Sequence, residues 1–299
     1  MITKNVILFI SFLSLFGCDL FDDDDPEPLI SEQQIDYSNS QSKVGCYVSG
    51  YSNVSSFGNK GVTFYDNYYD QKFNEEVVLQ GSFFGGIPAR VFVLYEPTVN
   101  HKNAYASPTG EILFGYHMFY YTVSTYGELA AAGVLAHEWG HRVQQSQFGN
   151  IANPLAELEA DAFSGLYMGL AKLWDWNQIR GYFANVYATG DYNFNSPDHH
   201  GTHDQRLAAA YLGLSTAISI SQSGSPMTYS QMHNLFTNEI NSSILSKTVN
   251  NKINYSDEYI SKSQIEDVKK ISSGINIDRN VRVSDQLSID DVRKLWPVE

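Results

Sequence analysis

Two histidines and a glutamate lie close together near the middle of the chain, in the segment His137-Glu138-Trp139-Gly140-His141. Residues i and i+4 share one face of a helix, so both imidazoles can bind one metal ion. Glu138 places a carboxylate beside them, where it can take a proton from a water molecule that the metal activates. The preceding residues 129–136 are apolar and indicate a buried helix, in which polar side chains need partners. The segment therefore predicts a metal site.

A catalytic zinc ion usually has three protein ligands and an open fourth position for water. The sequence offers a third ligand in Glu157, which comes 16 residues after His141. Asp161 shares the helical face of Glu157 and can accept a hydrogen bond from the outer ring nitrogen of a ligand histidine. Glu159 points about 160° away from that face, and we predict a solvated or salt-bridged carboxylate there. The sequence thus predicts one zinc ion per chain, bound by His137, His141 and Glu157.

The first of the two helices that carry these residues has recognisable ends. Residues 129–148 contain no proline, and Gly149 is a typical helix stop. Thr125 and Glu128 have the spacing of a capping box, which predicts that the helix begins at this point.

The second helix is predicted to begin at Asn153-Pro154, with asparagine as the cap and proline at the first helical position, and to run to about residue 174. A link of about four residues favours antiparallel neighbours in contact. The third ligand would then face the two histidines.

A small sheet is predicted before residue 120. β-branched and aromatic residues between Pro88 and Pro97 are typical of a strand, and Pro108 and Gly110 fit a turn between two more. The predicted strands are residues 90–95, 103–106 and 111–116, and further helices are predicted near residues 177–188 and 203–221. The fold class is therefore a helix-dominated α+β fold, with a small N-terminal sheet packed on the active-site helix.

Three more histidines lie in the segment Asp198-His199-His200-Gly201-Thr202-His203-Asp204. One interpretation is a second metal site. Another is that His200 or Arg206 stabilises the oxyanion of a tetrahedral intermediate. A third is a solvated loop in which Thr202 caps the next helix.

The composition argues for a packed body and against nucleic-acid binding. Of 299 residues, 43% are hydrophobic, so the chain can bury a sizeable core. Lys and Arg total 19 against 33 Asp and Glu, which gives a net charge of −14. This balance disfavours a surface that binds phosphates.

The N-terminus resembles a bacterial lipoprotein signal. Lys4 precedes an apolar run over residues 6–16, which is too short to span a membrane, and Cys18 follows a small residue. We predict a signal peptide over residues 1–17, lipidation of Cys18 and a solvated acidic tether over residues 18–30. The alternative is a plain signal peptide with an incidental cysteine. Cys46 is then the remaining cysteine, so an intramolecular disulfide is not available.

Three blocks in the chain resemble the motifs of the bacterial neutral zinc metallopeptidases, members of the gluzincin group. The blocks are residues 137–144 (HEWGHRVQ), 157–165 (ELEADAFSG) and 200–206 (HGTHDQR). The segment Asn103-Ala104-Tyr105-Ala106 also resembles a strand motif of the wider group, although Tyr105 stands where phenylalanine is commoner.

The resemblance implies specific roles. His137, His141 and Glu157 would be the zinc ligands, with Glu138 as the general base. Asn103, Ala104, Tyr105 and Ala106 would form the edge strand that pairs with an extended peptide substrate, and the position of His200 in the family favours it among the donors for the oxyanion.

These observations predict a zinc-dependent endopeptidase that is lipid-anchored in the bacterial cell envelope, facing the periplasm or the cell surface. Its substrate would be a peptide or protein, and nucleic acid is not an expected partner. The metallopeptidase domain would span residues 31–235, followed by a polar C-terminal extension over residues 236–299. The alternative is an anchored binding or adhesion lipoprotein whose zinc site is structural or inactive.

Overall fold

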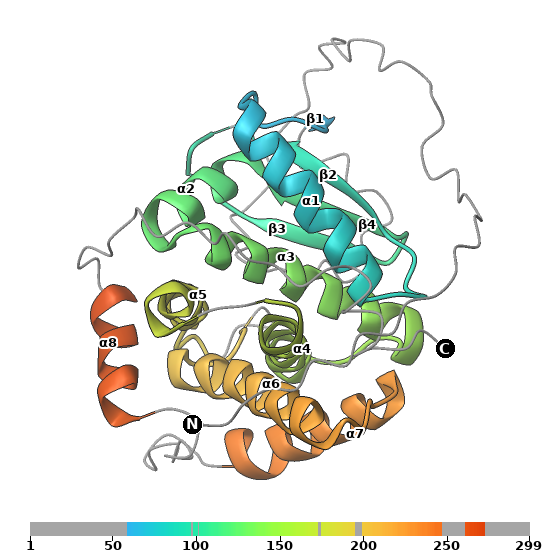
Figure 1. Cartoon of the computed structure of the whole chain (residues 1–299), viewed down its shortest axis with the longest axis vertical. Helices are drawn as coiled ribbons and strands as arrows, with labels where there is room; N and C mark the ends of the chain where they lie inside the picture. Colours follow the sequence, from blue (N-terminus) through green and yellow to red (C-terminus); the bar gives the residue numbers. More distant parts are fainter. Residues whose placement is uncertain are drawn as a thin grey trace, which may run out of the picture. The chain divides into compact units, whose positions relative to one another are not determined.

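The computed structural model of the chain (Figure 1) describes residues 59–96, 98–100, 102–172, 175–194, 199–246 and 261–272. All of these residues belong to one compact unit. The predicted signal peptide, the lipidation site Cys18 and the acidic tether lie outside the described residues, as does Cys46. In the described part of the chain, none of the helices has both the length and the apolar character that crossing a membrane requires.

A four-stranded mixed sheet precedes most of the helices. Its strands are β1 (Asn59–Gly61), β2 (Arg90–Tyr95), β3 (Ala104–Ser107) and β4 (Glu111–Gly115), and their order across the sheet is β1-β2-β4-β3. β2 and β4 are parallel, whereas β1 and β3 each pair with an antiparallel neighbour. The three strands predicted from the sequence are therefore present within one or two residues of their expected ends.

The two faces of the sheet have different surroundings. Phe114 of β4 belongs to the main core, and its ring lies 5.5 Å from that of Phe73 on helix α1 (Asn67–Phe83). On the opposite face, Leu94 and Leu113 form a small separate cluster. Apolar side chains of these strands are thus buried on both faces of the sheet.

Seven further helices follow the sheet, so the structure confirms a helix-dominated α+β fold in the described part of the chain. They are α2 (Tyr116–Tyr126), α3 (Glu128–Val143), α4 (Leu155–Ala171), α5 (Trp176–Ala188), α6 (His203–Ser223), α7 (Tyr229–Glu239) and α8 (Lys262–Ser272). Two π-helical segments, residues 144–148 and 240–245, extend α3 and α7.

Helices α3 and α4 lie in the centre of the fold (Figure 1). α3 lies next to β3 on one side and α4 on the other, and α6 packs against the far side of α4. Nearly every residue of both central helices is buried. A helix that is apolar on all sides must be covered on all sides, which is the position that these two occupy.

The predicted capping box before α3 is wrong. Thr125 lies inside α2, a helix that the sequence did not indicate, and the chain turns at Gly127, whose φ of 95° suits glycine. Glu128 instead accepts a hydrogen bond from the hydroxyl of Tyr68 on α1, at 2.9 Å. At the other end, Gly149 stops the helix as predicted, with a φ of 81° and its N–H bound to the Gln144 carbonyl.

The ends of α4 also differ from the prediction. Pro154 occupies the cap position rather than the first helical position, after a cis Asn153–Pro154 peptide, and Asn153 provides no side-chain cap. The helix ends at Ala171 rather than near residue 174. The expected antiparallel packing of the two central helices is nevertheless present, because His141, His137 and Gly133 contact Glu157, Asp161 and Ser164, respectively, so the contacts run in opposite directions along the two helices.

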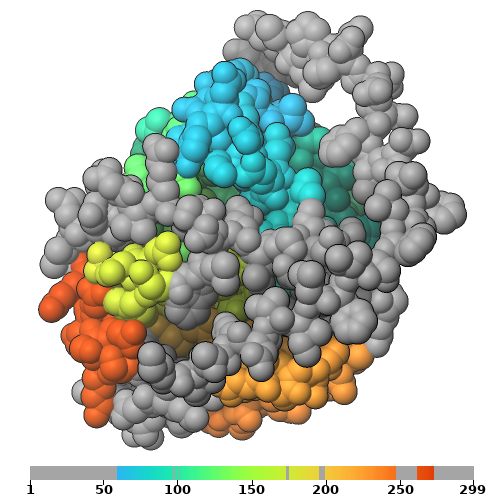
Figure 2. Space-filling view, viewed as in Figure 1, coloured from blue at the N-terminus to red at the C-terminus, as the bar shows by residue number. Residues whose placement is uncertain are grey.

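The C-terminal elements contact the body of the protein. α7 runs across the predicted domain boundary at residue 235, and α8 packs against α5. Figure 2 shows α7 in orange and α8 in red on the visible surface. The described parts of residues 236–299 are thus packed on the same body as the preceding helices.

Candidate metal centre

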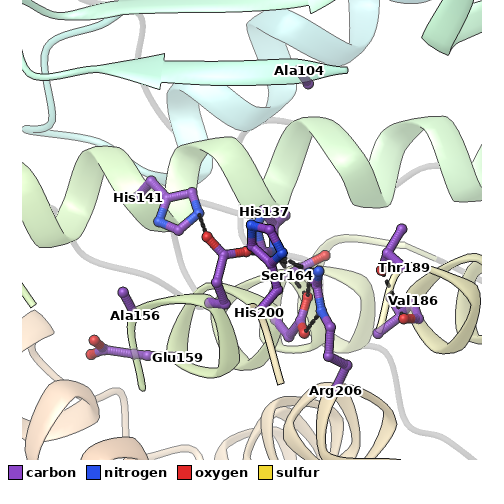
Figure 3. A network of polar contacts seen from close by, with 12 residues as sticks. Ala104, His137, His141, Ala156, Glu159, Ser164, Val186, Thr189, His200 and Arg206 are labelled. Atoms are coloured by element: carbon purple, nitrogen blue, oxygen red, sulfur yellow. Dashed lines mark hydrogen bonds and ion pairs between the residues drawn. The ribbon is translucent and has the colours of Figure 1, made fainter. Parts of the chain in front are cut away.

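Helices α3 and α4 bring three metal-binding side chains together (Figure 3). His137 and His141 lie one turn apart on α3, and Glu157 lies in the first turn of α4. The Nε2 atom of His137 is 3.4 Å from Glu157 Oε2, and the Nε2 atom of His141 is 3.4 Å from Glu157 Oε1. One ligand atom from each residue lies within 4.8 Å of the others. This buried cluster can hold a metal ion.

The separations within the cluster fit a tetrahedral ion better than a set of hydrogen bonds. Two atoms that each lie about 2.1 Å from a tetrahedral zinc ion are roughly 3.4 Å apart. A hydrogen bond would bring nitrogen and oxygen to about 2.7–3.2 Å. Neither oxygen of Glu157 accepts a hydrogen bond of normal geometry from the part of the chain that the structure describes, and both are buried. A buried carboxylate in this state needs a cation.

His137 is held from behind by Asp161, the residue whose i+4 spacing from Glu157 predicted this contact. Asp161 Oδ1 lies 2.9 Å from His137 Nδ1. Because a carboxylate accepts and does not donate, Nδ1 carries a proton, and Nε2 is the nitrogen that faces Glu157 and can bind a metal. Arg206 on α6 fixes Asp161 in turn, with Nε 2.7 Å from Oδ2 and Nη2 2.8 Å from Oδ1.

His141 has a comparable partner in Gln144. The Nδ1 atom of His141 lies 2.8 Å from Gln144 Oε1, which can only accept. His141 therefore also carries its proton on Nδ1. Both histidines turn their Nε2 atoms toward Glu157, and a metal ligand requires this nitrogen to be unprotonated.

The charges around the cluster keep its carboxylates ionised. Burial alone would raise the pKa of Glu157, but the positive charge and hydrogen bonding of the His141 and His137 imidazoles, when both ring nitrogens are protonated, outweigh it and hold that pKa well below its usual value. Burial also opposes the ionisation of Asp161, and the Arg206 guanidinium and His137 again lower its pKa below the usual value. Glu157 and Asp161 therefore both favour the ionised form, which is the form that binds a cation.

Glu138 lies on the same helix, directly after the first ligand. It is fully buried, as are His141 and Glu157, and His137 exposes 4% of its surface. Glu138 is therefore a buried carboxylate on the helix that carries both histidines. In this arrangement the ligand set is largely closed to solvent.

Gly140 allows the two central helices to approach each other at the cluster. A Cβ atom at this position would lie 2.9 Å from the Cα of Ala160 and 3.2 Å from its carbonyl oxygen. Both of these atoms belong to the backbone of α4, between Glu157 and Asp161. The ligand from α4 reaches the histidines because residue 140 has no side chain.

We expect Gly140→Ala to lower both the thermal stability and the metal affinity. Alanine is favoured in a helix by about 1 kcal/mol, but forcing two backbones apart costs about 1–3 kcal/mol, so the melting temperature should fall by a few degrees. Gly81→Ala on α1 is the matched control, because its nearest neighbour would be 4.0 Å away, and it should be neutral or stabilising. Thermal denaturation with and without zinc measures both effects, and equal melting temperatures for the two variants would contradict the prediction.

Residues 199–201, directly before α6, are buried, and Thr202 caps the helix. The cap itself is the one that an interpretation of the sequence proposed, and the structure adds that Thr202 forms a capping box with Gln205. His199 and His200 are both buried, and both contact Asp191. Burial lowers the pKa of His200, on which the charges of Glu157 and Arg206 also act. His200 is therefore a buried, largely neutral imidazole near the cluster.

The two other interpretations of this loop are constrained by the structure. Among the described residues, the cluster of His137, His141 and Glu157 is the single group with the spacing of a metal site. Arg206 directs two donors to Asp161, so its established contact is with a residue that supports a ligand. The catalytic role of His200 stays a prediction.

The expected peptide-binding strand is an edge strand. β3 pairs with β4 on one side and lies beside α3, and Ala104 and Ala106 are fully buried. The carbonyl oxygens of Ala106 and Ser107 accept hydrogen bonds from Gln145 and Arg142, respectively. These contacts tie the second half of the strand to the helix that carries the histidines.

Two carboxylates have positions that the sequence did not predict. Glu159 is fully buried, so a solvated carboxylate is wrong, but it does form an ion pair with His233 at 2.6 Å. Glu96 accepts hydrogen bonds from the backbone N–H groups of Asn103 and His117, which connects the start of β3 to the start of α2. Burial raises the pKa of Glu96 to about 7.

Comparisons with known proteins give no further information about the chemistry of this site. Searches against protein-family models, curated proteins and solved structures found no match. A function for the chain has to come from the chemistry of the site.

The sequence did not predict a role at the metal cluster for Gln144, which contacts His141, or for His233, which contacts Glu159. Gln144 carries a local signal, because it lies three residues after His141 and so shares its helical face. His233 carries none, because its contact is made across 74 residues of sequence. A long-range pair of this kind becomes visible when the helices are packed.

Proposed function

We propose that the protein is a zinc-dependent endopeptidase of the bacterial cell envelope, with His137, His141 and Glu157 as metal ligands and Glu138 as general base. The convergence of two Nε2 atoms and a buried carboxylate at 3.4 Å carries this proposal. The resemblance of the three sequence blocks to the gluzincin metallopeptidases supports it.

The donor set favours zinc among the common metals. Two neutral imidazoles and one carboxylate suit zinc, whereas calcium and magnesium prefer oxygen ligands. Three protein ligands also leave a fourth position for water or substrate, which is typical of a catalytic ion and not of a structural one.

Each residue would have a distinct task in peptide hydrolysis. When bound, a zinc ion supplies Lewis-acid chemistry, which polarises the scissile carbonyl and makes a water molecule more acidic. Glu138 would take the proton of the attacking water and deliver it to the leaving amine. Asp161 and Gln144 would keep the two ligand imidazoles in the Nδ1–H form. His200 is the proposed donor to the developing oxyanion.

An extended peptide would bind along the first half of β3. Edge strands recruit peptides by adding a strand, and this edge lies beside the helix that carries the ligands. The Ala106 and Ser107 carbonyls already accept bonds from Gln145 and Arg142, which favours pairing at Asn103–Tyr105. Lipidation of Cys18 would keep this site at the membrane surface.

The burial of the ligand set favours a second candidate, an anchored binding lipoprotein with a structural metal. His141, Glu138 and Glu157 have no exposed surface in the described structure, whereas a peptidase must admit water and substrate. The proposed peptidase therefore requires an opening movement at the cluster. A structural site would need none and would have no use for Glu138.

We expect chelator-sensitive cleavage of unstructured peptides. A peptide library digested by the zinc-loaded protein and analysed by mass spectrometry should show cuts that disappear with a chelator and return with zinc. The structural alternative predicts a lower melting temperature on chelation and no cuts in either sample. Cleavage that persists without metal would contradict both.

A further inference from the structure

A chain of hydrogen bonds connects the ligand His141 to helix α7. His141 Nδ1 lies 2.8 Å from Gln144 Oε1, and Gln144 Nε2 donates to Glu159 Oε2 at 3.0 Å. Glu159 Oε1 then lies 2.6 Å from the Nδ1 atom of His233. We call Gln144, Glu159 and His233 the His141 relay. It joins the end of α3, α4 and α7, which are far apart in the sequence.

The orientation of Gln144 is determined by its neighbours. Its Nε2 group donates one hydrogen to the Ala156 carbonyl at 2.8 Å and the other to Glu159, and it is 1% exposed. Because both of its hydrogens are used, the amide cannot be flipped without losing two hydrogen bonds. Its oxygen therefore faces His141 and keeps the proton of that imidazole on Nδ1.

The charge of Glu159 is balanced by His233. Glu159 is fully buried, and an ionised carboxylate in that position needs a cation. The hydrogen bond from His233 to Glu159 raises the pKa of the imidazole above its usual value, which favours the charged form. The ring of Phe148 stacks on His233 with the centroids 4.0 Å apart and holds it in place.

The two ligand histidines thus have equivalent supports. Behind His137, the carboxylate of Asp161 is neutralised by Arg206. Behind His141, the amide of Gln144 lies between the imidazole and the carboxylate of Glu159. The cation that pairs with this carboxylate is His233. An acceptor behind a ligand imidazole orients the ring and makes its free nitrogen a stronger donor to a metal.

We infer that the His141 relay is a positioning device that increases the affinity of the cluster for its metal ion, so that His233 on α7 acts on the site through Gln144. This inference rests on the metal site of the proposed function but not on peptide hydrolysis. The remote end of the relay lies near the surface, where α7 is visible in Figure 2 and 23% of the His233 side chain is exposed.

The inference predicts weaker metal binding when any link is removed. We expect Gln144→Leu, Glu159→Leu and His233→Leu each to lower the zinc affinity by about 10–100-fold, measured by competition with a chelating dye. The visible absorption of the cobalt-loaded protein should also change, because His141 is no longer held in one orientation. Glu159→Gln should retain most of the affinity, since an amide oxygen can still accept from Gln144.

A double variant separates the relay from a merely structural role. If His233 acts through Gln144, then His233→Leu should have no further effect on zinc affinity in the Gln144→Leu background. A structural role of α7 would instead lower the affinity by the same factor in both backgrounds, and that result would overturn the inference. Asn234→Leu is the matched control, because residue 234 is an exposed neighbour on the same helix, and it should leave zinc affinity unchanged.

The outcomes also distinguish the relay from the proposed function. Unchanged zinc affinity in the three leucine variants, with one equivalent of zinc bound, would reject the relay and leave the peptidase standing. A wild-type chain that binds no zinc would reject the relay together with the metal site. If Gln144→Leu or Glu159→Leu fails to fold, the test rests on the zinc affinity and the cobalt spectrum of His233→Leu, because the His233 side chain is partly exposed. Wild-type values for both would reject the relay.

Discussion

Glu138→Gln is expected to abolish peptide hydrolysis while the chain still binds one equivalent of zinc. The substitution keeps the size of the side chain but removes the group that accepts a proton. General-base catalysis contributes roughly 10²–10⁴-fold to a rate, so kcat/KM should fall by about that factor. The zinc ligands are His137, His141 and Glu157, and none of them is altered.

The measurement pairs peptide cleavage with zinc content by mass spectrometry. Glu128→Gln is the matched control, because it makes the same change at the start of α3, where the carboxylate contacts Tyr68 instead of the cluster. Activity near that of the wild type is expected for the control. Full turnover in the Glu138 variant would reject its role as base, and a loss of zinc would show that the residue supports the site structurally.

The spacing of residues predicted the centre of the site because helical geometry is local. His137 and His141 lie one turn apart, as do Glu157 and Asp161, and a short link brought the two faces together. The sequence could not show that neighbouring elements bury nearly every residue of α4. Glu159 points away from the ligands, and it was predicted to be solvated or salt-bridged because a helix usually has a solvated face.

The surroundings of α4 explain why solvation was the wrong alternative. Its sequence is largely apolar apart from three carboxylates and Ser164, which is itself a sign of a helix buried on all sides. Glu159 is therefore buried against α7 and finds its cation in His233. Which cation would pair with it could not be predicted, because the partner lies 74 residues away.

The helix ends were predicted less well, because tertiary contacts override local capping signals. Thr125 and Glu128 have the spacing of a capping box, but Glu128 is used by Tyr68 of α1, and a second helix, α2, extends over Thr125. In contrast, Thr202 and Gln205 form the box that their spacing allows, with no competing hydrogen bond to these side chains from the described residues. The strands of the sheet were predicted because proline and glycine mark their ends.

Removal of a metal ligand should lower the zinc affinity more than any other substitution considered above. We expect His141→Ala to reduce zinc content well below one equivalent and to abolish hydrolysis. A structural zinc site is worth roughly 10–16 kcal/mol over four ligands, so one ligand is worth about 3–4 kcal/mol, or an affinity change of about 10²–10³-fold. Glu157→Gln should weaken binding in the same direction, because it removes the negative charge that faces both imidazoles.

His203→Ala is the matched control for the ligand variant. His203 lies at the start of α6, its Nδ1 atom contacts the Tyr187 carbonyl at 2.6 Å, and its ring packs on Tyr187. It belongs to the same histidine-rich block as His200 but not to the cluster, so its loss should leave zinc content unchanged.

If His141→Ala retained a full equivalent of zinc while His203→Ala lost it, the metal would have to lie at the α6 loop. The arrangement argues against that result, because two carboxylates with one nearby cation, Arg206, surround His137 and His141, and a divalent ion is the charge that they require.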